Sequence, residues 1–584
     1  MSGQTRDAAE ELGDFTASPR LLAIATLAMV IGVVAAFVAK ALLALIAFFT
    51  NLFFFHRLSF AGSSPADHAL GWLVLFVPVA GALVIGLMAR YGSDRIRGHG
   101  IPEAIEAILI NGSRVQPKVA ILKPLSSAIS IGSGGPFGAE GPIIMTGGAI
   151  GSVIAQFFHL TSAERKTLLV AGAAAGMSAT FAAPVAAVLL AVELLLFEWK
   201  PRSFVPVALA SATALVVRRY ILGVGPLFAV PAHPVFIGPL GVLGCVAAGL
   251  LAGALSAALT SAVYAAEDAF SHLPIHWMWW PAIGGVAIGV GGYFFPHALG
   301  VGYDTIAGLL RGDVSMRVIA GLLIVKGLMW SISLGSGTSG GVLAPLLLMG
   351  GALGGVEALA LPDFGPGFWP LVSMGAILGG TMRSPFTGIV FLIELTHDVN
   401  MMLPLLVAVT VAHALTVLVL KRSILTEKIA RRGYHLSREY AIDPLEILFV
   451  REVMRTNVVA LPADAPPAKL QILRQNHSDL GQRLYPLVDR EGRLTGVITR
   501  GEGVVHDNPT LALADEPLRV IVHRMAKTGL TRFPVIDRVD TRVLVGMVSL
   551  EDLLKARALN LDAEDRRERT MRVKIAFPFG LGSG

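Results

Sequence analysis

Long runs of hydrophobic residues, separated by short polar breaks, fill the chain from residue 21 to about residue 420. Residues 21–50 form the first run, and about thirty apolar residues are enough for one long, tilted helix across a bilayer. Residues 73–88 form the next run. Later runs have uneven lengths and are interrupted by glycine and proline, which predicts helices that enter the membrane and end partway. The pattern predicts an all-α, polytopic membrane domain with broken, re-entrant helices.

Composition supports the membrane class. The 584 residues are 54% hydrophobic and only 15% charged, and a mean hydropathy of +0.68 is too high for a soluble globule. The formal charge of +6 is small for this length, so the basic residues indicate flanks of membrane segments and no nucleic-acid partner. The single cysteine, Cys245, excludes an intramolecular disulfide framework.

A glycine-rich segment at residues 132–142 lies between two apolar runs and carries one charge, Glu140. Its glycines allow positive φ and a close backbone approach to a ligand, and Pro142 suits the first turn of a helix. The N-terminus of such a helix presents unpaired N–H groups at the positive end of the helix dipole. The segment therefore predicts a small-anion site that contains one carboxylate.

The same segment occurs a second time, 203 positions later, at residues 335–345. Lys123 and Lys326 precede the two copies at equal distances, and Glu193 and Glu394 each follow a proline by nine residues. We predict an internal two-fold repeat of residues 21–230 and 236–420. Transport proteins with such repeats commonly place broken helices at the bilayer midplane, where helix N-termini face an anionic substrate.

The ends of the chain differ from its middle. Residues 1–20 lack the basic region of a secretory signal and are expected to form a cytoplasmic tail. The membrane domain is expected to end with a helix at 421–433, so that it covers 21–433 in all. A linker at 434–450 then leads to a soluble unit at 451–560, where a strand-turn-strand-helix pattern occurs twice, and to a basic tail at 561–584.

Three short motifs, in order, resemble signatures of the CLC family of chloride channels and proton-coupled chloride transporters. G-H-G-I-P at 98–102 resembles the family's GSGIP, G-A-E-G-P at 138–142 its G-K/R-E-G-P, and G-V-L-A-P at 341–345 its G-x-F-x-P. Residues 451–560 resemble the tandem CBS domains that many members carry. The resemblance implies a CLC-type inverted repeat, a small cytoplasmic α/β unit, and a homodimer with an anion path in each subunit.

The resemblance also implies functional positions, with Glu140 as the gate. A carboxylate tethered at a helix N-terminus competes with the anion: deprotonated it fills the site, and protonated it loses that attraction and can move aside. The implied anion-binding positions are His99, Gly100, Ile101, Ala139, Gly141, Val342, Leu343 and Leu425.

Three departures from the family pattern affect the expected mechanism. His99 stands in place of a serine hydroxyl, and Leu425 in place of a tyrosine hydroxyl. Leu194 stands where proton-coupled members carry a glutamate, which favours a passive voltage- or pH-gated chloride channel over an H⁺/Cl⁻ antiporter. Glu193 is then the candidate for a proton path, with His99 as a second possible relay. The alternative is that Glu193 and Glu394, equivalent in the two repeats, make a shared structural hydrogen bond.

Other charged residues have open alternatives. Lys123 and Lys326 are costly in a bilayer, and both anion attraction and snorkelling explain them. Arg383 is expected to donate to loop carbonyls. In the soluble unit, Thr499, Ser549 and Asp552 fit half-motifs for an adenine nucleotide, and a purely structural contact is the alternative.

We therefore predict chloride transport by an integral, multi-pass protein of the plasma (inner) membrane with both termini cytoplasmic. No cofactor is expected to be required, and chloride is the expected bound substrate. A membrane-embedded enzyme is a distant alternative, because no HExxH signature occurs in the apolar segments. We expect no enzymatic activity.

Overall fold

A computed structural model describes residues 19–434, 445, 448–464, 482–499, 505–537 and 542–565. The expected N-terminal tail up to residue 18, most of the expected linker, and residues 566–584 lie outside this part of the chain. Two compact units are present, one within Gly13–Arg438 and one within Glu439–Gly584.

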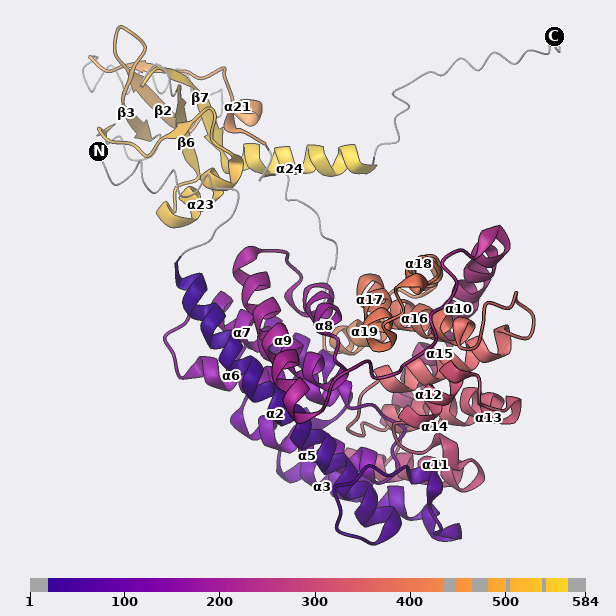
Figure 1. Cartoon of the computed structure of the whole chain (residues 1–584). Coiled ribbons are helices and arrows are strands. Elements are labelled where there is room, and N and C mark those ends of the chain that lie inside the picture. The colour runs from indigo at the N-terminus through magenta and orange to yellow at the C-terminus, as the bar shows by residue number, and fades with distance from the viewer. Residues whose placement is uncertain are drawn as a thin grey trace, which may run out of the picture. The chain divides into compact units, whose positions relative to one another are not determined.

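The first repeat of the larger unit is helical throughout. Its elements are α2 (Arg20–Phe55), η1 (Pro65–Asp67), η2 (Gly71–Leu75), α3 (Val77–Tyr91), η3 (Asp94–Ile96), α4 (Ile101–Leu109), α5 (Pro117–Gly132), α6 (Glu140–Gln156), α7 (Ser162–Phe181), α8 (Pro184–Leu190), the π-helical η4 (Ala191–Leu196) and α9 (Pro201–Ile221). Figure 1 draws this half in indigo to magenta.

The second repeat follows the same order of long and short helices. Its elements are α10 (Gly238–Ser271), η5 (Trp277–Trp279), α11 (Trp280–Phe294), η6 (Pro296–Ala298), α12 (Tyr303–Arg311), α13 (Met316–Gly321), the π-helical η7 (Leu322–Lys326), α14 (Gly327–Gly335), α15 (Leu343–Glu357), α16 (Phe368–Met382), α17 (Pro385–Thr396), η8 (Val399–Met401) and α18 (Met402–Val419). The helix α19 (Ile424–Arg431) ends the unit. Across the two repeats α3 packs on α11, and α8 packs on α17.

Helix lengths confirm the predicted mixture of spanning and shorter helices. Within the described residues, six helical segments are long and apolar enough to cross a membrane, whereas α15, α16 and α17 are shorter apolar helices. Small residues bring helices together in the interior. A Cβ atom on Gly147 of α6 would overlap the carbonyl of Gly172 of α7, and the reverse also holds, so these two helices cross at backbone contact.

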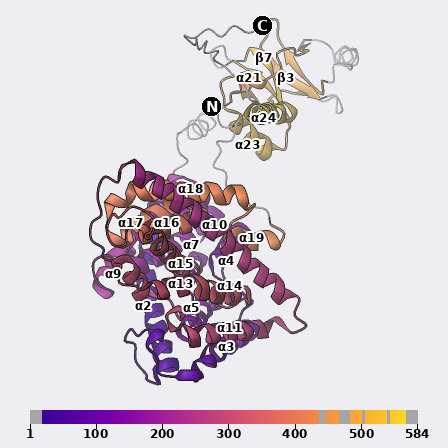
Figure 2. The same ribbon diagram turned by 90° about the vertical axis from the view of Figure 1, so that its right-hand side faces the viewer.

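The smaller unit contains two small sheets (Figure 2). Its elements are α21 (Val450–Val453), β1 (Leu461–Pro462), β2 (Leu484–Val488), β3 (Leu494–Thr499), β4 (Val505–His506), β5 (Ala512–Leu513), α23 (Leu518–Thr528), β6 (Arg532–Ile536), β7 (Leu544–Ser549) and α24 (Leu550–Asp565). The sheet orders are β1-β2-β3-β4 and β5-β6-β7, and in each the first pair is parallel and the second antiparallel. The predicted strand-turn-strand pattern thus occurs twice, with a helix after β7.

Candidate functional site

The three glycine motifs meet at the centre of the membrane unit, where backbone hydrogen bonds join the two repeats. Gly138 and Gly341 exchange two bonds: the Gly138 N–H donates to the Gly341 carbonyl (3.1 Å), and the Gly341 N–H donates to the Gly138 carbonyl (2.9 Å). Gly98 joins the same cluster, because its N–H donates to the carbonyl of Thr338 (3.2 Å). The motifs predicted to act together are therefore held together.

Glu140 is the first residue of α6 and is completely buried. Within the described chain, neither of its carboxylate oxygens has a hydrogen-bond partner. The N–H groups of Glu140 itself and of Ala344, which lies in the first turn of α15, favour the charged form of the carboxylate. A Cβ atom on Gly341 would come within 2.9 Å of Glu140 Oε2, so only glycine leaves room for this carboxylate. Glu140 thus lies between the N-termini of α6 and α15, whose dipoles favour negative charge there.

The N-cap residues of the two helix starts around Glu140 do not occupy the N–H groups there with their own side chains. Ala139 is the N-cap residue of α6 and Val342 that of α15, and neither helix has a side-chain cap. Gly141 and Leu343 lie in the first turns, and both are buried. These predicted positions therefore lie at the two helix starts that flank the carboxylate, where backbone N–H groups have no partner within the helix.

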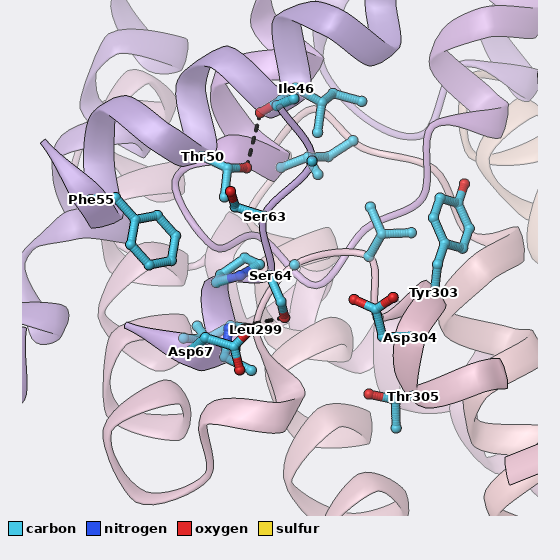
Figure 3. Close-up of a pocket in the computed structure, with 18 of the residues that line it drawn as sticks. Ile46, Thr50, Phe55, Ser63, Ser64, Asp67, Leu299, Tyr303, Asp304 and Thr305 are labelled. Atoms are coloured by element: carbon cyan, nitrogen blue, oxygen red, sulfur yellow. Dashed lines mark hydrogen bonds between the residues drawn. The ribbon is translucent and has the colours of Figure 1, made fainter. Parts of the chain in front are cut away.

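Two cavities approach this centre. A cavity of about 310 Å³, here called the His99 cavity, is lined by His99 and Tyr264 and by the charged residues Asp94, Arg97, Glu267, Lys428, Arg431 and Arg432. His99 is buried, and its Nδ1 atom has no hydrogen-bond partner among the described residues. A second cavity of about 680 Å³, here called the Tyr303 cavity, is lined by Ala139, Tyr303 and Asp304 among others (Figure 3). Ala139, which precedes Glu140, thus lines the Tyr303 cavity, and His99, whose carbonyl lies against Gly141, lines the His99 cavity.

The start of α4 differs from the expected anion-binding arrangement. Gly100 precedes Ile101, the first residue of α4, but its N–H donates to Glu103 Oε2 (2.9 Å) within its own helix. Glu103 Oε1 also accepts from Lys428 Nζ (2.7 Å), and the Glu103 side chain is 1% exposed. This amide is therefore already occupied, and the glutamate three residues after Gly100 was the sequence signal for such a cap.

Leu425 lies fully buried in the first turn of α19. The carbonyl of its neighbour Ile424 accepts a hydrogen bond from the hydroxyl of Tyr264, on α10. Tyr264 lines the His99 cavity, and sequence reasoning missed it. Only the hydrogen bond between Tyr264 of α10 and Ile424 of α19 reveals it, because a lone tyrosine in an apolar helix carries no signal of its own.

Both buried lysines hold glycine loops by hydrogen bonds to backbone carbonyls. Lys123 Nζ donates to the carbonyls of Ile96 and Gly98 (both 2.8 Å), and Lys326 Nζ donates to the carbonyls of Gly300 (2.9 Å) and Val301 (3.4 Å). Lys123 also donates to the hydroxyl of Ser339 (3.2 Å). The segment 337–341 has the G-x-S-x-G spacing of a hydrolase, but its serine, Ser339, is engaged at this repeat junction.

Glu193 and Glu394 cap each other's helices. Glu394 accepts from the N–H groups of Val185 (3.0 Å) and Ala186 (2.8 Å), in the first turn of α8. Glu193 accepts from Thr387 through its N–H (2.9 Å) and its hydroxyl (2.5 Å), in the first turn of α17. These contacts correspond to the shared structural hydrogen bond of the sequence analysis, and a proton path through Glu193 stays a prediction.

Arg383 was expected to donate to loop carbonyls, and this is confirmed. Its Nη2 atom donates to the carbonyl of Thr416 (2.9 Å) and also to that of Leu420. The guanidinium thus fixes the end of α18.

The candidate nucleotide residues of the smaller unit are partly engaged. The Ser549 hydroxyl donates to Asp552 Oδ2 (2.6 Å), and Arg455 Nε donates to Asp552 Oδ1 (2.8 Å). This bond to Asp552 raises the pKa of Arg455 above its usual value. Thr499 ends β3 and is partly buried. No cluster of three metal-ligating side chains occurs among the described residues.

Comparison with known proteins decides the family. Residues 80–417 match the family described as voltage gated chloride channel, and residues 450–502 and 501–559 each match the CBS domain. The chain belongs to the CLC family. The "H(+)/Cl(-) exchange transporter ClcA" of Yersinia pestis is 30% identical over 370 residues, which cover 59% of this chain and 75% of that protein.

Other CLC proteins show a similar likeness. A "Putative chloride channel protein ClcB-like" of Ralstonia nicotianae is 29% identical over 58% of this chain and 81% of its own length. The crystal structure of a slow cyanobacterial Cl⁻/H⁺ antiporter matches with a TM-score of 0.63 at 22% identity, over 71% of this chain and 98% of that one. A eukaryotic CLC transporter matches with a TM-score of 0.57 at 22% identity, over 91% of this chain and 98% of that one. At this identity the structures show the CLC fold alone. CLC proteins transport anions across membranes, and their family comprises transporters and channels.

Proposed function

We propose that this CLC protein carries chloride between the His99 cavity and the Tyr303 cavity, with Glu140 as the gate. The observation that carries the proposal is the fully buried Glu140 carboxylate, which has no hydrogen-bond partner among the described residues and lies between two helix starts without side-chain caps. The backbone N–H groups at these helix starts, which favour a negative charge without being hydrogen-bonded to the carboxylate, are the donors a chloride ion needs. Carboxylate and chloride therefore compete for one place.

The competition gives the gate its mechanism. The ionised Glu140 side chain fills the anion site, and the path is closed. Protonation removes its negative charge, so the helix dipoles no longer hold it and chloride takes its place. Glutamine has the shape of the protonated acid and should mimic the open form at every pH.

We propose further that transport is passive. Leu194 is fully buried and has no proton to exchange, and Glu193 already accepts hydrogen bonds at the start of α17. The alternative is an H⁺/Cl⁻ antiporter, which is favoured by the 30% identity to proteins named H(+)/Cl(-) exchange transporter. The two alternatives differ in whether chloride movement is coupled to protons.

Chloride efflux from liposomes that contain the full-length protein tests the gate. Glu140→Gln is expected to raise efflux at pH 7 several-fold and to remove its dependence on pH between 5 and 8, and Glu140→Ala should do the same. Asp313→Ala is the matched control, since Asp313 pairs with Arg311 on the surface. Efflux of Glu140→Gln that equals the parent in rate and pH profile would contradict the gate.

Reversal potentials separate the channel from the antiporter. In a passive path the reversal potential follows the chloride gradient alone, and an imposed pH gradient leaves it unchanged. A shift that follows the proton gradient would establish proton coupling and overturn the passive mechanism.

We also propose that two copies assemble as a homodimer in the plasma (inner) membrane, with both termini cytoplasmic. The CLC resemblance supports the dimer and the orientation. For the smaller unit we propose an adenine nucleotide as ligand, bound by Ser549 and Asp552 after Arg455 releases the latter. We propose that transport requires no other cofactor.

A further inference from the structure

The two repeats contain matching loops, one before α4 and one before α12. Gly98-His99-Gly100-Ile101 in the first corresponds to Gly300-Val301-Gly302-Tyr303 in the second, 202 positions later. Gly100 and Gly302 have positive φ values (89° and 85°) and directly precede α4 and α12. A buried lysine binds a carbonyl of each loop, Lys123 at Gly98 and Lys326 at Gly300. Tyr303 therefore occupies in the second repeat the place of Ile101 in the first.

The two loops differ in their polar groups. At α4, the Glu103 side chain occupies the N–H of Gly100, whereas α12 has no side-chain cap. Tyr303 also adds a hydroxyl group, which Ile101 lacks. The second loop thus has a hydroxyl donor that the first lacks, and no side chain caps the helix that follows it.

The Tyr303 hydroxyl is buried and has no hydrogen-bond partner among the described residues. Its ring packs near Phe228, with 6.2 Å between ring centroids. Figure 3 shows the ring extending from the start of α12 away from Asp304 and Thr305. A buried hydroxyl without a partner destabilises the protein unless it gains a partner during function.

The Tyr303 phenol interacts electrostatically with the Glu140 carboxylate. The two carboxylate oxygens of Glu140 also lack partners among the described residues. A phenol O–H is a donor, and a carboxylate or a halide in its place is an acceptor. Tyr264, the tyrosine of the His99 cavity, is not available in the same way, because its hydroxyl donates to Ile424.

We propose that Tyr303 supplies the side-chain hydroxyl that binds the transported anion on the side of the Tyr303 cavity. The proposal rests on the proposed anion path through Glu140. Because a phenol binds by a hydrogen bond, it favours a compact anion with concentrated charge, such as chloride, over thiocyanate, whose charge is spread over three atoms. Tyr303 is thus a specificity-determining residue of the path.

Isothermal titration of the full-length protein in detergent tests the proposal. Glu140→Gln provides a parent without the competing carboxylate, and Tyr303→Phe is added to it. Loss of a hydrogen bond to an anion is expected to weaken chloride binding about tenfold or more, and thiocyanate binding less than about threefold. Tyr293→Phe in the same background is the matched control, since Tyr293 is an exposed tyrosine of α11.

The outcomes are distinct. Unchanged chloride affinity, or an equal loss for both anions, would overturn the role of Tyr303 while the anion path stands. A parent that binds neither anion would overturn the anion path and the inference together. Tyr303→Phe alone, in liposomes, gives a second measurement: its chloride-to-thiocyanate flux ratio should fall about threefold or more, and an unchanged ratio would refute the proposal.

Discussion

Glu193 and Glu394 each cap the helix start of the other repeat, and removing either cap should destabilise the membrane unit. The dependence of transport on protons should stay the same. Glu394→Ala deletes the acceptor for the N–H groups of Val185 and Ala186. A hydrogen bond to a charged acceptor contributes about 1.5–3 kcal/mol, and loss of an N-terminal cap costs about 0.5–2 kcal/mol. Val185 is 54% exposed, so its hydrogen bond to Glu394 contributes little to stability. The expected loss in the free energy of unfolding is about 2 kcal/mol.

The matching change in the first repeat should cost somewhat more. Glu193→Ala removes the acceptor for two N–H groups, of Phe386 and Thr387, and for the hydroxyl of Thr387 as well. The additional side-chain bond raises the expected loss to about 3 kcal/mol. The glutamine variants of Glu193 and Glu394 keep one acceptor oxygen and should lose about half as much.

Thermal denaturation of the full-length protein in detergent measures the effect. One kcal/mol lowers the midpoint by about 2–4 °C in a domain of 150–250 residues and by less in a larger one, so we expect decreases of about 2–5 °C. Asp313→Ala, which removes an exposed ion pair with Arg311, is the control and should shift the midpoint by less than about 1 °C.

Proton dependence provides the decisive readout. Because both glutamates act as caps, Glu193→Gln and Glu394→Gln should leave the reversal potential in a pH gradient equally unaffected. A change confined to Glu193→Gln would refute this reasoning and place Glu193 on a proton path.

Two further predictions concern other ion pairs. Glu103→Gln should destabilise the protein by about 3 kcal/mol, because it leaves Lys428 without its partner, and thermal denaturation should show part of the loss restored in Glu103→Gln/Lys428→Met. Equal midpoints for the single and double variants would contradict the pairing. Arg455→Ala should tighten ATP binding several-fold in calorimetry, because it frees Asp552, whereas Ser549→Ala should weaken it. Unchanged affinities in both would exclude this nucleotide site.

Much of the membrane fold could be predicted from the sequence, because the positions of glycine and proline mark both the internal repeat and the ends of the broken helices. The copies at 132–142 and 335–345 predicted two helix starts at one centre, and Gly138 and Gly341 are indeed hydrogen-bonded. The only charge in these segments, Glu140, is the buried carboxylate at their junction. The local sequence pattern was enough to predict this junction, because glycine, which has no side chain, allows the two backbones to come into contact.

The partners of polar side chains could not be predicted in the same way. Equal spacing showed that Glu193 and Glu394 are equivalent, but only the packing of α8 on α17 brings each to the other's helix start. Neither Tyr264 nor Tyr303 lies in one of the three family motifs, and each lines a cavity only because helices distant in the chain come together there. One-dimensional pattern carries no such information.

The double hydrogen bond between Gly138 and Gly341 limits how the path can open. Drawing α6 and α15 apart would break both bonds at a buried place where water cannot replace them, at a cost of several kcal/mol. Rotation of the Glu140 side chain would break neither bond, because both bonds join backbone atoms. The backbone at this junction is thus a rigid frame, and the gate proposed above needs only the Glu140 side chain to move, not a hinge between α6 and α15.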